Sequence, residues 1–174
     1  MRGLENILSP FERLGLPRRF SLDASELERK YLALSRGAHP DFHSDATAEV
    51  QAHAEAESAA INEAYATLKD PFRRAEALLK LLGGPNASEQ KEMPPAFLME
   101  MLELREQIEG ATGPTKAKIE SELLERETTL FAAIENSFAE CEPPPAPPAL
   151  LKGIRRDLNA AKYLRGLLRD LRNP

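Results

Sequence analysis

The sequence has one cysteine and no tryptophan, and only 6% of its 174 residues are aromatic. The single cysteine, Cys141, cannot form an internal disulfide. Nor can it supply the three or four thiolates that usually hold structural zinc or an iron-sulfur cluster. We therefore expect no cofactor bound by this chain itself.

Long apolar runs are also missing. No stretch approaches the about 20 apolar residues of a membrane span, and residues 1–9 include Arg2 and Glu5 without the apolar centre of a signal peptide. A net charge of −5 argues against general nucleic-acid binding, which needs a basic surface. These absences predict a cytoplasmic protein that binds neither membrane nor nucleic acid.

Helical patterning runs through the whole chain, and 42% hydrophobic residues suffice for a core. Ser9-Pro10-x-Glu12 is a capping box, and Asp23 with Glu26 caps a second helix. In this second helix Leu27, Tyr31 and Leu34 recur on one predicted buried side. The fold class is predicted to be all-α, with helices over residues 10–14, 23–36, 46–68, 71–82, 96–109, 114–140 and 150–172.

The third helix carries an apolar stripe rich in small residues, which suits close antiparallel packing against the second. Glu57 interrupts that stripe, and no sequence feature explains it. Gly83-Gly84-Pro85 marks the expected boundary between domains at 1–82 and 90–174. The last three helices predict a three-helix bundle. The proline-rich residues 142–148 are either a stiff bridge between two of them or a polyproline ligand.

The tripeptide His39-Pro40-Asp41 lies between the second and third predicted helices. A proline has no backbone donor and disfavours helical geometry in the preceding residue, so His39 must lie beyond the helix. The residues alone describe a stiff, exposed turn that presents an imidazole and a carboxylate to another molecule. An ordinary proline turn is the alternative.

A metal site is the competing interpretation of the same region. Five potential ligands lie close together in sequence: His39, Asp41, His43, Asp45 and His53. A hydrolytic metal enzyme could use such ligands, but Pro40 breaks the helical turn that would bring His39 and His43 together. No nucleophile–base pair or glycine-rich phosphate loop is present. We expect no metal site and no enzymatic activity.

The segment after Pro95 has more apolar residues than one core face needs. At about 100° per residue, four of them form a core stripe: Phe97, Met101, Leu104 and Ile108. Leu98 and Leu102 fall outside it, with Met99 near the back of the helix and carboxylates at Glu103 and Glu106. An apolar strip edged by carboxylates is typical of a docking surface. The alternative is that Leu98 and Leu102 pack inside the bundle.

The last helix has a second outward-facing apolar residue. Ile154, Leu158, Ala161 and Leu168 share one face and predict its core stripe. Tyr163 lies about 180° from Ile154 around the helix. A large aromatic is therefore expected on the outer face.

A short helix, a helix carrying basic residues, the His-Pro-Asp turn and a long third helix together resemble a J domain of the DnaJ class. Residues 10–17 (PFERLGLP), 61–68 (INEAYATL) and above all 97–106 (FLMEMLELRE) resemble the HscB family, the J-type co-chaperones of iron-sulfur cluster assembly. The resemblance extends over residues 10–171. The His-Pro-Asp turn marks only a J domain, whereas residues 97–106 separate HscB proteins from other J proteins.

The resemblance implies a co-chaperone in which the J domain stimulates a DnaK-type ATPase (HscA-like) and the bundle delivers the scaffold IscU. We expect the protein to be a monomer. The implied chaperone contacts are His39, Pro40, Asp41, Arg29, Lys30 and Arg36. The implied scaffold contacts are Leu98, Met99, Leu102, Glu103, Glu106 and Tyr163. A J-domain adaptor for a different client remains the alternative. Two departures from the family pattern are Phe42, where many J domains have a basic residue, and Gly110, where some relatives are acidic.

Overall fold

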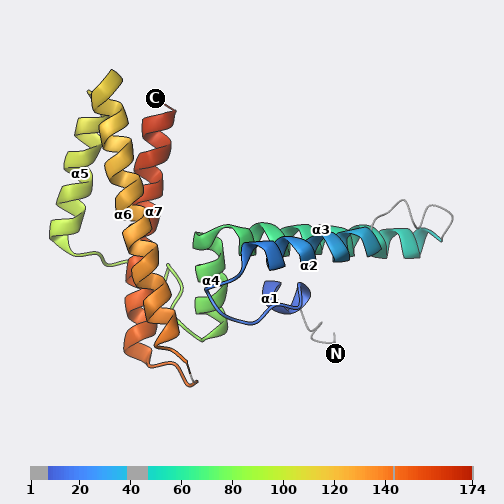
Figure 1. Cartoon of the computed structure of the whole chain (residues 1–174). Helices are drawn as coiled ribbons and strands as arrows, with labels where there is room; N and C mark the ends of the chain where they lie inside the picture. Colours follow the sequence, from blue (N-terminus) through green and yellow to red (C-terminus); the bar gives the residue numbers. More distant parts are fainter. Residues whose placement is uncertain (1–7, 39–46, 143, 174) are drawn as a thin grey trace. The chain divides into compact units, whose positions relative to one another are not determined.

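The computed structural model describes residues 8–38, 47–142 and 144–173, and this part of the chain contains helices and no strand. The helices are α1 (Pro10–Arg13), α2 (Ala24–Gly37), α3 (Ala48–Lys69), α4 (Pro71–Leu81), α5 (Pro95–Glu109), α6 (Gly113–Ala139) and α7 (Pro148–Arg172) (Figure 1). The all-α prediction is confirmed. The chain forms two compact units, Met1–Leu78 and Leu79–Pro174. None of the helices in the described ranges is long and apolar enough to span a bilayer.

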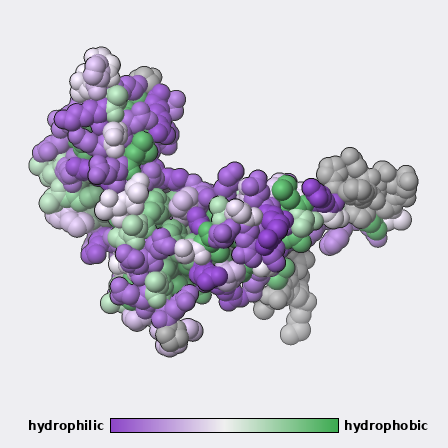
Figure 2. Space-filling model, viewed as in Figure 1, coloured by the Kyte–Doolittle hydropathy of each residue, from purple (hydrophilic) through white to green (hydrophobic). Residues whose placement is uncertain are grey.

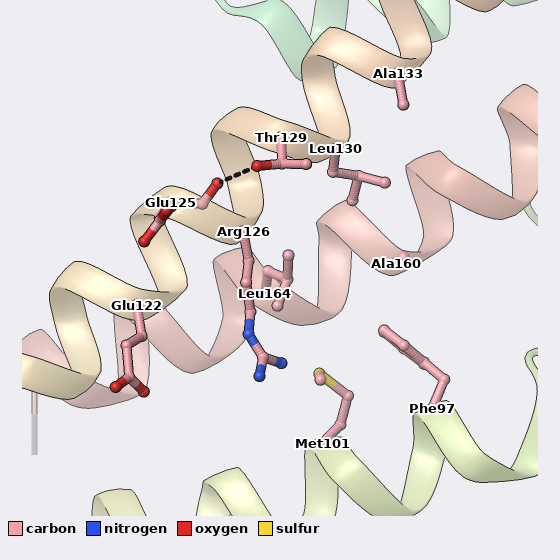
Figure 3. A pocket seen from close by; sticks show the side chains of 10 residues that line it. All are labelled: Phe97, Met101, Glu122, Glu125, Arg126, Thr129, Leu130, Ala133, Ala160 and Leu164. Atoms are coloured by element: carbon pink, nitrogen blue, oxygen red, sulfur yellow. Dashed lines mark hydrogen bonds between the residues drawn. The ribbon is translucent and has the colours of Figure 1, made fainter.

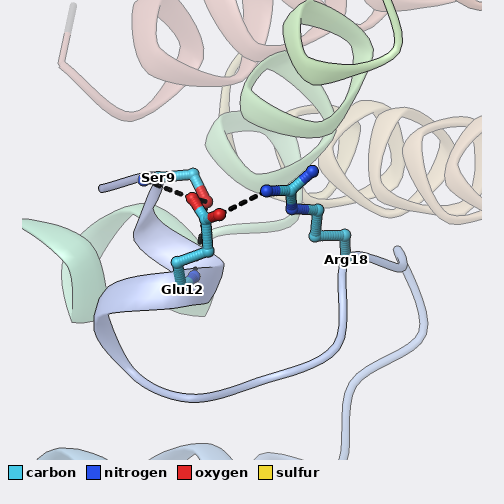
Figure 4. A network of polar contacts seen from close by, with 3 residues as sticks. All are labelled: Ser9, Glu12 and Arg18. Atoms are coloured by element: carbon cyan, nitrogen blue, oxygen red, sulfur yellow. Dashed lines mark hydrogen bonds and ion pairs between the residues drawn. The ribbon is translucent and has the colours of Figure 1, made fainter. Parts of the chain in front are cut away.

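The first helix begins at the predicted capping box (Figure 4). The Ser9 hydroxyl accepts a hydrogen bond from the Glu12 backbone N–H, at 3.3 Å, and the Ser9 backbone N–H donates to the Glu12 carboxylate, at 2.9 Å. Arg18 forms an ion pair with the same carboxylate. The Ser9 hydroxyl and backbone hydrogen bonds, followed by Arg18, lower the pKa of Glu12 to about 2.

The lowered pKa of Glu12 predicts a pH dependence of stability. Because the folded state favours the ionised carboxylate, this contribution is present above the ordinary pKa of 4.5 and is lost as the pH falls toward 2. The Glu12→Gln variant should therefore show a flatter decline of unfolding free energy over that pH range. A carboxyl NMR titration should place the Glu12 midpoint near 2; a midpoint at the ordinary value would contradict the network.

The second and third helices form an antiparallel hairpin, as expected from the small-residue stripe on α3 (Figure 1). Tyr31 of α2 stacks on Tyr65 of α3 with ring centroids 4.1 Å apart. The Tyr31 hydroxyl also donates to the Asn62 side-chain oxygen at 3.0 Å. Leu27 and Ile61 are buried between the helices. These contacts hold α2 in one rotation about its axis, which decides which of its side chains face outward.

The sequence prediction for Leu34 of α2 is wrong. Its side chain was expected on the buried side but is 37% exposed, and Val50, also expected in the α3 stripe, is 45% exposed. The reason is that α1 covers the hairpin only at its other end, so two helices alone cannot enclose these side chains (Figure 1). They line a hollow of about 380 Å³. Apolar side chains are visible near that end of the hairpin in Figure 2.

Glu57 is explained by a partner far away in sequence. Both of its carboxylate oxygens accept hydrogen bonds from the Arg13 guanidinium of α1, each at 2.8 Å. The Arg13 side chain is mostly buried, whereas Glu57 is partly exposed. The ion pair fastens α1 to α3 and makes a carboxylate acceptable inside an apolar stripe.

Removing this pair should destabilise the first unit. Glu57→Gln is expected to lower the free energy of unfolding by about 1 kcal/mol, because a partly buried Arg13 loses its charged partner. Glu63→Gln is the matched control, since Glu63 pairs with Arg73 at an exposed site. That change should cost less than about 0.5 kcal/mol. Equal losses in urea denaturation would show that burial gives the Arg13 pair no special weight.

The last three helices form the expected three-helix bundle in an up-down-up arrangement (Figure 1). α7 packs against both α5 and α6, and it supplies about half of the buried core. The core cluster consists of Met101, Leu104, Ile119, Leu123, Leu164, Leu167, Leu168 and Leu171.

Two buried polar residues of α7 hold the segment that precedes the bundle. The Arg155 side chain is 1% exposed and its Nε donates to the Pro85 carbonyl at 3.0 Å. The Asn159 amide, 8% exposed, donates to the Gln90 carbonyl at 2.8 Å. Gln90 in turn donates to the Lys152 carbonyl at 3.0 Å. Residues 85–90 are therefore part of the second unit rather than a free tether.

Candidate partner-binding surfaces

An apolar strip lies on the outer face of α5. Leu98 is 41% exposed, Met99 61% and Leu102 55%. The carboxylates of Glu103 and Glu106 are also exposed beside them. The alternative that Leu98 and Leu102 pack in the bundle core is wrong, because other residues of the helix already fill that core. We call these five residues the α5 strip.

Tyr163 of α7 extends this exposed surface onto a second helix. It is 45% exposed, as its predicted outward position requires. Its ring and the Phe97 ring are arranged edge to face, with centroids 5.7 Å apart and an interplanar angle of 80°. Such an edge-to-face pair is a favourable aromatic geometry. Phe97 therefore links the core stripe of α5 to the exposed aromatic of α7, a link that helix periodicity alone did not predict.

The rotation of α5 about its axis is set by contacts on three sides. Met101 and Leu104 are buried in the core. Arg105 pairs with Asp170 of α7 at 3.3 Å, and Glu100 pairs with Arg126 of α6 at 2.5 Å. Because both flanks and the inner face are occupied by these contacts, the α5 strip is held facing outward. A surface presented by a rigid helix loses little conformational entropy on binding.

A second candidate surface is the basic side of α2. Arg29 and Arg36 are exposed, and Lys30 is half-buried. The stacked Tyr31 and the buried Leu27 face α3, which turns Arg29 and Arg36 away from it, whereas the Lys30 ammonium lies beside Gly15. The surface suits an acidic partner. The turn residues His39, Pro40 and Asp41 lie outside the described residues.

The metal interpretation rests mostly on residues that the structure does not describe. Four of the five potential ligands, His39, Asp41, His43 and Asp45, lie outside those ranges. The fifth, His53, is exposed on α3 and belongs to no cluster of three potential ligands in the described part. Cys141 is buried, and burial, aided by the neighbouring Glu140 charge, raises the pKa of its thiol.

The roles of Arg155 and Asn159 are not predicted by the sequence. Each directly follows a core residue of α7, Ile154 and Leu158, so both lie at the edge of the buried stripe. Polar residues repeated four apart beside a core stripe were the available signal. Their acceptors are backbone carbonyls of residues 85–90, which no side-chain pattern identifies.

Family models match both parts of the chain. The DnaJ domain matches residues 9–77. The HSCB C-terminal oligomerisation domain matches residues 93–172. The two matches follow each other without overlap, on either side of the segment 78–92. The α5 strip and Tyr163 fall within the second match.

Similar proteins carry the HscB name. A Vibrio cholerae serotype O1 protein, "Co-chaperone protein HscB homolog", is 48% identical over 59% of this chain and 60% of its own length. The Proteus mirabilis "Co-chaperone protein HscB" is 40% identical over 62% of this chain and 63% of its own length. The matched part thus covers less than two thirds of these curated relatives.

Two solved structures extend over nearly the whole chain. Chaperone HscB from Vibrio cholerae superimposes with a TM-score of 0.80 at 30% identity, over 95% of this chain and 96% of that chain. Human co-chaperone protein HscB gives a TM-score of 0.84 at 23% identity, over 99% of this chain and 84% of that chain, a likeness of fold. With both family domains in order and an HscB structure matched along its length, this chain belongs to the HscB family of J-domain co-chaperones.

Proposed function

We propose that this protein stimulates the ATPase of a DnaK-type chaperone of the HscA kind and delivers the iron-sulfur scaffold IscU to it. In this proposal residues 1–82 form the J domain and its connecting helix, and residues 90–174 form the scaffold-binding three-helix bundle. The protein acts as a monomer in the cytoplasm, and the cluster is cargo of the scaffold. The observation that carries the proposal is the α5 strip, which stays exposed after the bundle core is complete.

The chaperone-binding side rests on the J domain. In this proposal the chaperone contacts the His39 imidazole, Pro40 and the Asp41 carboxylate. Arg29, Lys30 and Arg36 add positive charge on α2. A carboxylate at Asp41 can form a bidentate pair with a chaperone arginine, an interaction with strict geometry. The basic residues of α2 increase the rate of encounter with an acidic chaperone surface more than the final affinity.

The scaffold-binding side rests on Leu98, Met99, Leu102, Glu103, Glu106 and Tyr163. Apolar side chains surrounded by carboxylates provide the anchor and the polar rim of a protein–protein interface. The Phe97–Tyr163 ring pair supports the proposal, because it holds the exposed aromatic beside α5. The carboxylates favour a client surface with positive charge.

In this proposal two binding surfaces on one chain are sufficient, and the co-chaperone needs no active site of its own. Once the scaffold is bound to the bundle, its encounter with the chaperone becomes intramolecular and its effective concentration there rises. Hydrolysis is then triggered while the client is present. The chemistry of ATP remains the chaperone's.

Single-turnover ATPase assays with purified HscA-type chaperone test the proposal. We expect stimulation by this protein alone and a further increase when IscU is added. Stimulation without any effect of IscU, together with failure of IscU to bind in a pull-down, would favour an adaptor for another client. Absence of stimulation would refute the chaperone partner itself.

A further inference from the structure

A groove of about 580 Å³ lies between α5 and α6 in the second unit (Figure 3). It exists because α5 packs mainly on α7 rather than on α6. Its apolar floor is made by Phe97, Met101, Leu130 and Leu164 from three helices. Figure 3 shows Phe97 and Met101 of α5 facing the α6 side chains across the opening.

This groove is separate from the α5 strip. Glu100, which pairs with Arg126, marks the flank of α5 that faces α6. At about 100° per residue, Leu98 and Leu102 lie on the other flank, the one that faces Tyr163. A partner bound to the α5 strip therefore leaves the groove open.

The rim of the groove carries unbalanced negative charge. Arg126 is already paired with Glu100 across the opening. Lys118 is 3.8 Å from Glu122, an exposed pair within one helix that contributes little. Glu122 and Glu125 therefore remain available to basic groups of a partner. The apolar floor of the groove favours apolar side chains of a partner, and its acidic rim favours cationic side chains next to them.

The length of the groove and the small side chains at one of its ends suit a helix. Its α6 wall runs from Glu122 to Ala133, and at 1.5 Å per residue these three turns extend about 16 Å. Thr129, Ala133 and Ala160 at one end are small, so another backbone can approach closely there. A helix in this position would cover the open α5–α6 side and complete a four-helix arrangement.

We propose that this groove docks a short amphipathic helix of a protein partner, with apolar side chains on one face and lysine or arginine beside them. This mode is the familiar helix-in-groove recognition, read by anchors one turn apart. The proposal goes beyond the function proposed above, because it adds a second protein-binding surface to the bundle.

Binding of defined peptides to the full-length protein tests the proposal. The probe is a 14-residue helical peptide with leucines on one face and flanking lysines. Two control peptides replace the lysines by glutamate or the leucines by serine. Fluorescence anisotropy should detect only the first peptide. Methyl NMR shifts should change at Met101, Leu130 and Leu164 and not at Leu98 or Leu102.

Protein variants then locate the site. Glu122→Gln/Glu125→Gln should weaken binding of the lysine peptide at least tenfold. Glu109→Gln/Glu140→Gln removes two carboxylates elsewhere on the bundle and should change the affinity less than twofold. Ala133→Phe fills the groove at an exposed position, so it should block binding with an unchanged melting temperature.

The proposal would be overturned by no binding of the lysine peptide, by equal binding of the glutamate or the serine peptide, by insensitivity to Ala133→Phe, or by shifts confined to Leu98 and Leu102. Sedimentation of the protein alone provides one more test. A dimer that Ala133→Phe dissociates would show that a second copy of the chain occupies the groove, which also contradicts a basic partner helix. None of these measurements requires the chaperone or the scaffold, so their outcome is independent of the proposed function.

Discussion

Replacing Asp41 by asparagine is expected to abolish stimulation of the chaperone ATPase while leaving the fold and scaffold binding intact. The reason is geometric: a bidentate arginine–carboxylate pair loses one charged acceptor, and an amide offers a donor where the guanidinium needs an acceptor. His39→Gln should have the same effect. Single-turnover ATP hydrolysis, measured at saturating co-chaperone, should fall to the rate of the chaperone alone.

The control for this prediction is His53→Gln. It removes an imidazole from the exposed side of α3 without touching the His-Pro-Asp turn, so stimulation should be retained. Circular dichroism and scaffold pull-down should be normal for all three variants. Normal stimulation by Asp41→Asn and His39→Gln would contradict the assignment of the chaperone contact.

Truncating apolar side chains of the α5 strip, or Tyr163 beside it, should weaken scaffold binding without destabilising the protein. Leu102→Ala and Tyr163→Ala remove large side chains that are about half exposed, and a central anchor of an interface contributes roughly 2 kcal/mol or more. Leu98→Ala should act in the same direction. Isothermal titration with IscU measures the loss, about 30-fold in Kd for 2 kcal/mol. Stimulation of the chaperone without scaffold should be unchanged.

Two leucine controls separate binding from stability. Leu104→Ala leaves a cavity in the bundle core and should cost roughly 2 to 5 kcal/mol of unfolding free energy. Leu124→Ala removes an exposed side chain of α6 outside the α5 strip and should change neither stability nor scaffold affinity. If Leu102→Ala lost as much stability as Leu104→Ala with no specific loss of binding, the α5 strip would be structural.

Local signals in the sequence predicted the helices and their inner faces. The Ser9 capping box and the Asp23 cap work through hydrogen bonds that span three residues, so the necessary information is contiguous. Helical periodicity correctly assigned Met101 and Leu104 to the core. The same periodicity predicted the exposure of the α5 strip, because side chains outside a satisfied core stripe have nowhere else to go.

Periodicity failed where burial depends on how many elements cover a face. Leu34 has the right spacing for a buried residue, yet no third helix reaches its end of the hairpin. The periodicity of apolar residues indicates only the direction in which a side chain points from its own helix. Whether another element arrives to cover it is a property of the tertiary arrangement.

The sequence by itself therefore determined the all-α class, the succession of helices, the core stripes of the bundle helices α5 and α7, and the outward position of the α5 strip and Tyr163. The tertiary structure alone decided the pairing of Glu57 with Arg13, the contact of Tyr163 with Phe97, and the attachment of residues 85–90 to α7. It also decided that a groove opens between α5 and α6. The physical reason is that capping and periodicity depend on residues only a few positions apart. The contacts that the sequence did not predict join groups 44 to 70 residues apart, and they form only when whole helices pack together.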